Sequence, residues 1–405
     1  MACSDLVMTR RGLLHGAGTL TAWSMIPRVA SAAGSRDPRF LLIILRGALD
    51  GLNTLVPTGD PDWARLRDDA HLRVNGVSKG LPLDGFFTLN PSLPTLYELY
   101  RAKQAALVHA VATPYRGRSH FAGQHVLESG LPDYKRNTTG WMNRLIASLP
   151  TVGAERVAGS GLSVGPVVPL IMRGAAPVTA WSAEGAAPQD DDTVDRLLAL
   201  YDRTEPVLHR AFAQAVEAQR MTVTSGQDRN GSRGLAARFA RMARGAGRLM
   251  AVPEGPRVAT MSFDGWDTHA SQGPLDGQLA RRLAALDAAI AALQESLAPV
   301  WQNTVVTVVT EFGRTVHENG NDGTDHGTGT TALLFGGAVQ GGRIITDWPG
   351  LSPESLWENR DLRPTTDLRA VLKAVAEQHL GVSETTLATD IFPETGDLRA
   401  VQGLF

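Results

Sequence analysis

The chain has 405 residues, with 39 lysines and arginines against 41 aspartates and glutamates, and a formal net charge of −2. A charge this close to zero argues against a protein that binds nucleic acid or an anionic membrane surface. The single cysteine, Cys3, excludes a disulfide framework within the chain.

Residues 1–33 are typical of a twin-arginine signal peptide. Arg10 and Arg11 precede a weakly apolar stretch from Leu13 to Ile26, and small residues at 30–33 follow in the pattern of a cleavage site. We therefore expect export by the Tat translocase and a mature protein that is periplasmic or secreted. The alternative is the basic N-terminus of a cytosolic protein. After residue 33 no apolar run approaches the roughly 20 residues that span a bilayer, so we expect no membrane span in the mature chain.

Strand-like and helix-like patterns then alternate along the chain. The sequence predicts strands at residues 40–45, 107–111, 257–263, 304–310 and 332–335, and helices at 93–102, 120–127, 275–297 and 366–380. The last helix is expected to be capped by Thr365 or Thr366. The pattern loosens at about 152–227, which we interpret as a cap or an insertion. This alternation predicts an α/β fold with a mostly parallel central sheet and helices on both faces.

Polar side chains gather where the predicted strands end. Parallel sheets bind ligands beyond the carboxyl ends of their strands, so these side chains are candidates for one common site. The acidic and histidine candidates are Asp50, His120, Asp264, Asp267, His269, Glu311, Asp325 and His326. Carboxylates and imidazoles together suit Zn²⁺, with Mn²⁺ or Mg²⁺ possible where oxygen ligands dominate.

Ser119 has two possible roles. It stands at the expected start of a helix, where a serine most often caps the first turn, and we favour this interpretation. A hydroxyl at a helix N-terminus beside a metal could instead act as a nucleophile on a phosphoryl or sulfuryl group.

The other histidines and the glycines of the same region are weaker candidates. We expect His109 in the core and His71, His209 and His379 at the surface, while His125 and His317 remain open. Glycines 320, 323, 327 and 329 are expected to form turns that bring His326 inward.

Five motifs then carry a resemblance to a known family. They are LRGALDGLNTLVP, RSHFAGQHVLESG, FDGWDTHAS, TEFGRTVHENGNDGTDHGTGTTALLFGG and GGRIITDWPGL. Together they resemble the bacterial exported family called domain of unknown function 1501, from Phe40 to Val382. That family is similar in turn to the alkaline phosphatase and sulfatase superfamily, which implies a single alkaline-phosphatase-like α/β domain over residues 37–405.

The resemblance also implies roles for individual residues. Ser119 would be the nucleophile, and one metal position would be built from Asp264 or Asp267 with His269 and His326. A second position, from Asp50, Ser119 and Glu311, lacks a ligand, because the superfamily has Asp-His where this chain has Glu311. His120 could fill that gap, or Arg314 could replace the cation as a fixed charge that holds an anion.

Two functions follow from the resemblance. The first is metal-dependent hydrolysis of phosphate or sulfate esters, with a small-molecule or polysaccharide substrate. The alternative is a noncatalytic envelope protein that binds a polysaccharide or a protein partner through the same sheet edge.

Overall fold

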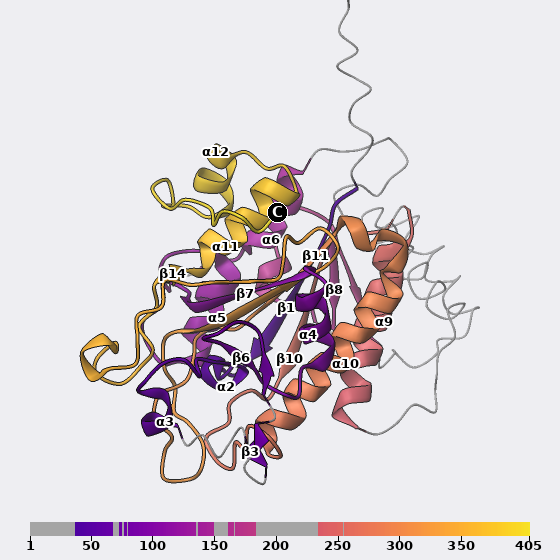
Figure 1. Cartoon of the computed structure of the whole chain (residues 1–405). Coiled ribbons are helices and arrows are strands. Elements are labelled where there is room, and N and C mark those ends of the chain that lie inside the picture. Colours follow the sequence, from indigo (N-terminus) through magenta and orange to yellow (C-terminus); the bar gives the residue numbers. More distant parts are fainter. Residues whose placement is uncertain are drawn as a thin grey trace, which may run out of the picture. The chain divides into compact units, whose positions relative to one another are not determined.

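The computed structural model describes residues 37–67, 73–74, 77–78, 80–134, 137–149, 161–165, 167–183, 234–253 and 255–405. The described part of Pro38–Phe405 forms one compact unit around a nine-stranded sheet (Figure 1). The strand order is β13-β7-β12-β11-β1-β10-β8-β9, and β14 pairs with β7. The strands are β1 (Arg39–Arg46), β7 (Ala105–Ala112), β8 (Gly161–Val164), β9 (Val178–Trp181), β10 (Val258–Asp264), β11 (Thr304–Val309), β12 (Thr330–Phe335), β13 (Arg343–Ile345) and β14 (Thr366–Asp367).

Short strands and the helices complete the described elements. Two small sheets consist of β2 (Leu55–Val56), β6 (Thr88–Leu89) and β5 (Leu81–Pro82), and of β3 (Arg73–Val74) and β4 (Val77–Ser78). The α-helices are α2 (Gly51–Thr54), α3 (Trp63–Leu66), α4 (Pro94–Arg101), α5 (His120–Ser129), α6 (Trp141–Ser148), α9 (Leu235–Ala251), α10 (Gln278–Ser296), α11 (Leu368–Ala374) and α12 (Glu384–Thr386). Short helices of the 3-10 or π type are η2 (Leu170–Met172), η3 (Ala298–Asn303), η4 (Pro353–Ser355), η5 (Val375–His379) and η6 (Leu387–Ile391). None of the described helices is long and apolar enough to cross a membrane.

The main sheet is parallel except at β12. That strand runs antiparallel to both of its neighbours, β11 and β7, while the other pairs in the sheet are parallel. The beginning of β12 therefore lies at the same edge as the carboxyl ends of β1, β7, β10 and β11. The predicted mostly parallel sheet is confirmed, and its one reversed strand brings the residues ahead of Thr330 to the edge where ligands bind.

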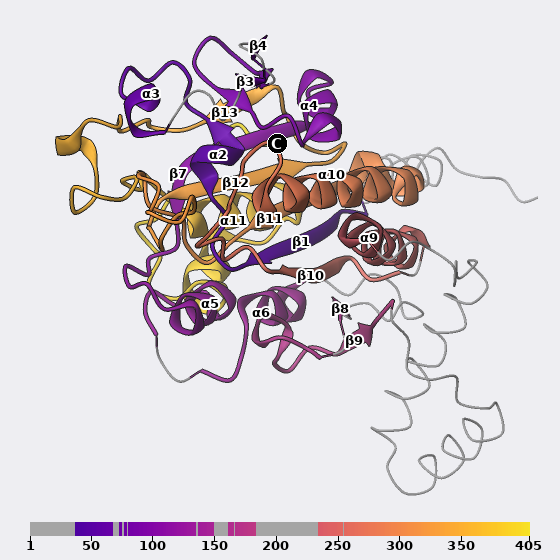
Figure 2. The ribbon, with the colours of Figure 1, turned by 90° about the horizontal axis from the view of Figure 1, so that it is seen from below.

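Helices cover both faces of the sheet, as predicted (Figure 2). Along β1, Leu41, Ile43 and Leu45 pack into the core under α4, α9 and α10, while the alternate residues pack with α6 and α11 on the other face. A strand buried on both faces needs apolar side chains at every position, which is why residues 40–45 are a continuous apolar run. These two cores fix the strand ends that carry the polar side chains.

The structure differs from the prediction in two places. Of the expected cap at 152–227, the described residues 161–165 and 167–183 contribute β8 and β9 to the main sheet, where β8 pairs in parallel with β10. The rest of that region lies outside the described residues, as does the predicted signal peptide at 1–33. The final helix is capped by Asp367, which accepts a hydrogen bond from the Arg369 amide, because Thr366 is already paired with Val111 in the sheet.

Candidate metal centre

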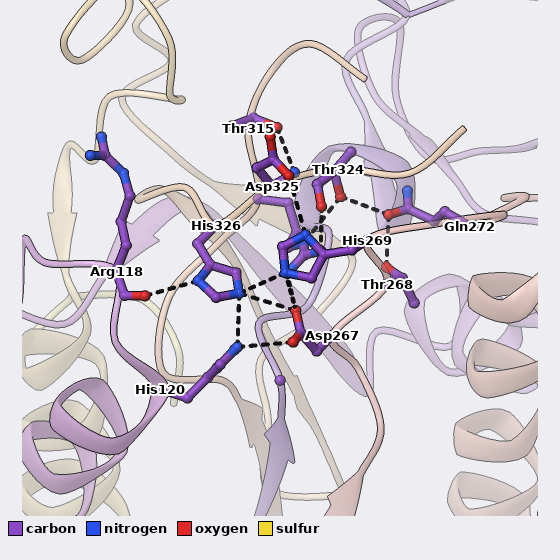
Figure 3. Close-up of polar contacts among 12 residues, drawn as sticks. Arg118, His120, Asp267, Thr268, His269, Gln272, Thr315, Thr324, Asp325 and His326 are labelled. Atoms are coloured by element: carbon purple, nitrogen blue, oxygen red, sulfur yellow. Dashed lines mark hydrogen bonds and ion pairs between the residues drawn. The ribbon is translucent and has the colours of Figure 1, made fainter. Parts of the chain in front are cut away.

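Four side chains converge at the carboxyl edge of the sheet (Figure 3). His120 begins α5, Asp267 and His269 follow β10, and His326 precedes β12. The ligand atoms of His120, Asp267 and His326 all lie within 4.8 Å of one another. The His326 Nε2 atom lies 2.9 Å from the Nε2 atom of His120 and 2.9 Å from that of His269. Asp267 Oδ1 lies 3.1 Å from His326 Nε2 and 3.0 Å from His269 Nε2.

The opposite ring nitrogens all face hydrogen-bond acceptors. His326 Nδ1 lies 2.8 Å from the carbonyl oxygen of Arg118, which can only accept. His120 Nδ1 lies 2.7 Å from Glu311 Oε1, and His269 Nδ1 lies 3.2 Å from Asp325 Oδ1. These partners place the proton of each neutral imidazole on Nδ1 and leave a lone pair on Nε2. Three lone pairs and a carboxylate directed at one another repel unless a cation lies between them, and this pattern of outer partners is typical of metal-bound histidines.

Glu311 holds His120 in place. Its Oε1 atom also accepts hydrogen bonds from the Gly47 amide at 2.9 Å and from Gln124 Nε2 at 3.1 Å. Burial alone would raise the pKa of Glu311, but the hydrogen bonds from His120, Gln124 and the Gly47 amide outweigh it and lower that pKa. The hydrogen bond to Glu311 in turn raises the pKa of His120. Glu311, predicted as a metal ligand, contacts His120 Nδ1 instead of joining the converging group, which includes His120.

Asp267 is held by Arg314. The guanidinium donates from Nη1 to Asp267 Oδ1 at 2.6 Å, from Nε to Thr324 Oγ1 at 3.0 Å, and from Nη2 to the Thr324 carbonyl. Burial would raise the pKa of Asp267, but the hydrogen bond and charge of Arg314, together with contributions from His269 and His120, lower it. Burial also lowers the pKa of His326, which favours its neutral form. The Arg314 side chain is 0% exposed and paired with Asp267, so it is not an open site for an anion.

Asp50 lies in a separate buried ion pair. Its Oδ2 atom is 2.8 Å from Arg67 Nη1 and accepts from Gln272 Nε2 at 2.6 Å, and its Oδ1 atom caps α2 through the Asn53 amide. Burial would raise the pKa of Asp50, but the charge and hydrogen bonds of Arg67 lower it. The structure thus gives Asp50 a cationic partner from the protein itself and does not bring it into the converging group.

The remaining predicted residues lie around the cluster. Ser119 stands at the predicted capping position of α5 and accepts a hydrogen bond from the Ala122 amide at 3.5 Å. Its side chain is exposed. Asp325 is half exposed and holds His269. Asp264 ends β10 with an exposed side chain, and Gly265, with φ +93°, then turns the chain so that Asp267 reaches the cluster.

The other histidines divide into core and periphery. His109 is fully buried, with Nε2 2.8 Å from the Leu55 carbonyl, as predicted. His379 was expected at the surface, but it is half-buried, stacks on Phe405 and places Nε2 3.0 Å from the Arg39 carbonyl. His125 packs against Tyr134, and His317 is exposed; neither is in the cluster. His71 and His209 lie outside the described residues.

Three residues that support the site were not among the sequence candidates. Arg67 and Gln272 contact Asp50, and Gln124 contacts Glu311. None of the three belongs to a recognisable motif on its own. The only signal was the position of Gln124 and Gln272, each shortly after a predicted ligand.

Glycines of the loop before β12 allow close backbone approach. A Cβ atom at Gly323 would overlap the backbone of His269, and one at Gly327 would overlap the backbone of Arg314. Neither glycine has a positive φ, so their role is to leave space for the facing loop and not to adopt a left-handed turn.

Gly323→Ala is therefore expected to separate the two loops that carry His269 and His326. Overpacking of this kind lowers the free energy of unfolding by about 1–3 kcal/mol. Urea unfolding of the purified protein measures the change. Gly320→Ala is the matched control, since a Cβ atom there meets nothing within 4 Å. Equal midpoints for the two variants would contradict the close-approach explanation.

Residues 101–392 match the family described as "Protein of unknown function (DUF1501)". The chain belongs to this family. None of the curated proteins matches the chain in sequence.

Solved structures that match this chain include a sulfatase, a phosphonate monoester hydrolase and an alkaline phosphatase. The PsFucS1 sulfatase from Pseudoalteromonas sp. is 11% identical, with a TM-score of 0.39, 98% of this chain covered and 77% of that one. The phosphonate monoester hydrolase of Agrobacterium radiobacter is 12% identical, with a TM-score of 0.31 and coverages of 76% and 70%. Alkaline phosphatase from the Antarctic bacterium TAB5 is 11% identical, with a TM-score of 0.31 and coverages of 74% and 92%. Likenesses this distant carry no activity over to this chain.

Proposed function

We propose that His120, Asp267 and His326, with His269 beside them, hold one divalent metal ion. The observation that carries this proposal is the convergence of the Nε2 atoms, with His326 Nε2 lying 2.9 Å from those of His120 and His269, beside the Asp267 carboxylate. A set richer in imidazole than in carboxylate favours Zn²⁺ over Mg²⁺, with Mn²⁺ as the next candidate. Glu311, Asp325 and the Arg118 carbonyl act as the outer partners that fix the three rings.

We further propose that this centre hydrolyses phosphate or sulfate esters of a small molecule or a polysaccharide. A metal bound there would polarise an ester oxygen and lower the pKa of a coordinated water molecule. The protein itself contributes the exposed Ser119 hydroxyl, next in sequence to His120, as the candidate nucleophile. The N-terminus of α5 would attract the anionic ester group, because its first amides point toward Ser119 and carry partial positive charge.

The test is a panel of phosphate monoesters, phosphate diesters and sulfate esters, assayed with added Zn²⁺, Mn²⁺ or Mg²⁺ and again after chelation. We expect turnover of at least one class that is lost with the chelator. Ser119→Ala and Ser119→Asn should both lose turnover, and Ser119→Asn should keep its stability because asparagine caps helices as well as serine does. Turnover retained by Ser119→Asn would exclude this serine as the nucleophile.

A noncatalytic role is the second candidate. Asp50 and Glu311 are satisfied by Arg67 and His120, so among the described residues they offer no second cation position at this edge. An envelope protein that binds a polysaccharide or a protein partner here would turn over no ester of the panel, whether or not metal is added.

Export by the Tat translocase to the periplasm or medium is likewise our proposal. Its support is the order of Arg10, Arg11, apolar stretch and cleavage pattern in the sequence. Replacing both arginines by lysine is expected to leave the unprocessed protein in the cytoplasm, because the translocase recognises the arginine pair. Cell fractionation followed by immunoblotting measures this, with Arg28→Lys as the control in the same segment. Normal processing of the double variant would contradict the assignment.

A further inference from the structure

A buried glutamine connects the candidate metal centre to the Asp50–Arg67 ion pair. The Gln272 side chain is 2% exposed. Its Nε2 atom donates to Asp50 Oδ2 at 2.6 Å. Its Oε1 atom accepts from the hydroxyls of Thr268 and Thr324, each at 2.8 Å (Figure 3). A single amide therefore joins three separate segments of the chain.

The outer end of this connection is rigidly held. Asp50 and Arg67 are both 1% exposed. The Arg67 guanidinium also donates to the carbonyl oxygens of Val316 at 2.6 Å and Thr315 at 2.7 Å. The ion pair thus ties the loop after β1 to the backbone that follows Arg314.

The inner end reaches a proposed metal ligand. Thr324 Oγ1 accepts from Arg314 Nε at 3.0 Å while donating to Gln272, and Arg314 Nη1 donates to Asp267 Oδ1 at 2.6 Å. Every donor from Arg314 through Thr324 and Gln272 to Asp50 points the same way, an arrangement in which hydrogen bonds strengthen one another.

The backbone around Gln272 shows why such a connection is needed. Ser271 has φ 47° and Asp322 has φ 53°, left-handed conformations that side-chain-bearing residues rarely adopt. The two loops pair through Ser271 N to the Asn321 carbonyl at 2.9 Å and Gln272 N to the Asp322 carbonyl at 2.7 Å. Strained residues persist only where their surroundings hold them, and here Gln272 lies in the middle of the paired loops.

We propose that Gln272 is a positioning residue. It locks the loop that carries Asp267 and His269 to the loop that carries His326, so that the converging atoms are held in place before any metal arrives. This inference rests on the proposed metal centre for its function, while the locking of the loops is a property of the protein alone.

The test compares Gln272→Met, which keeps the side chain's length and removes its hydrogen bonds, with wild type and Gln104→Met. Gln104 is the matched control because it accepts a 3.0 Å hydrogen bond from Trp301 Nε1 at the opposite edge of the sheet. Amide hydrogen exchange on the metal-free protein measures the local stability of the two loops, and competition with a chelator measures the affinity for Zn²⁺. We expect faster exchange confined to residues 266–273 and 319–326, and about 10- to 100-fold weaker Zn²⁺ binding, in Gln272→Met only.

Each outcome decides the proposal. Unchanged exchange in both loops of a folded Gln272→Met, or a fall in thermal stability equal to that of Gln104→Met with Zn²⁺ affinity unaltered, would overturn it. If Gln272→Met does not fold, Thr268→Val removes one donor to the same amide, and the same exchange and Zn²⁺ affinity measurements are made on that variant. Wild type that binds no Zn²⁺ would remove the proposed function, and the exchange measurement would still show whether Gln272 locks the loops.

Discussion

His326→Ala is expected to abolish metal binding to the purified, natively exported protein. His326 Nε2 lies at the middle of the cluster, next to His120, His269 and Asp267. Its loss therefore removes the nitrogen atom that lies nearest to all the other proposed ligand atoms. Wild type should carry about one equivalent of a transition metal, as a site with three or four protein ligands does. Mass spectrometry of the metal content measures both proteins.

His317→Ala is the control for that experiment. His317 lies on the same connection between β11 and β12, is exposed, and is not among the converging groups. It should keep the metal content of wild type. Absence of metal from wild type and both variants would remove the metal centre from consideration and favour the binding role at this edge.

Arg67→Met is expected to be the most destabilising single change of those considered. It leaves the Asp50 carboxylate buried without its cation, and removing one partner of a buried ion pair costs about 3–5 kcal/mol. The double change Asp50→Leu with Arg67→Met should recover part of this loss, since no unpaired charge then remains. Urea unfolding followed by circular dichroism measures all three proteins.

Arg65→Met supplies the comparison on the same short helix. Arg65 pairs with Asp62 at 2.9 Å, but its side chain is 56% exposed, and exposed pairs contribute about 0–1 kcal/mol. A loss in Arg67→Met no larger than that in Arg65→Met would show that Asp50 is stabilised by something other than Arg67.

The fold could be predicted where burial alone determines the residue type. The apolar run at 40–45 and the β-branched run at 304–309 are strands buried on both faces, and their residue types are typical of such strands. The same patterns carry no strand direction. The reversal of β12 therefore had to come from the structure, although His326 reaches the expected edge only because of it.

The sequence predicted which residues gather at the candidate site better than it predicted what each of them does there. Asp267, His269 and His326 come together because they follow β10 or precede β12 at the same edge of the sheet, and His120 joins them from the start of α5. Whether a carboxylate is a ligand or a partner of a ligand depends on what lies beside it in space. Glu311 faces a ring nitrogen and Asp50 faces a guanidinium, and both neighbours come from other segments of the chain.

β11 and β12 are consecutive in the chain, adjacent in the sheet and antiparallel, so they form one hairpin. Glu311, Arg314, Asp325 and His326 therefore all lie on the connection of one hairpin. In the assembly of the fold, this hairpin can form from nearby segments without waiting for a crossover. In the divergence of the family, we expect that insertions or deletions in this one connection can re-space His326 against His120 while every strand keeps its place.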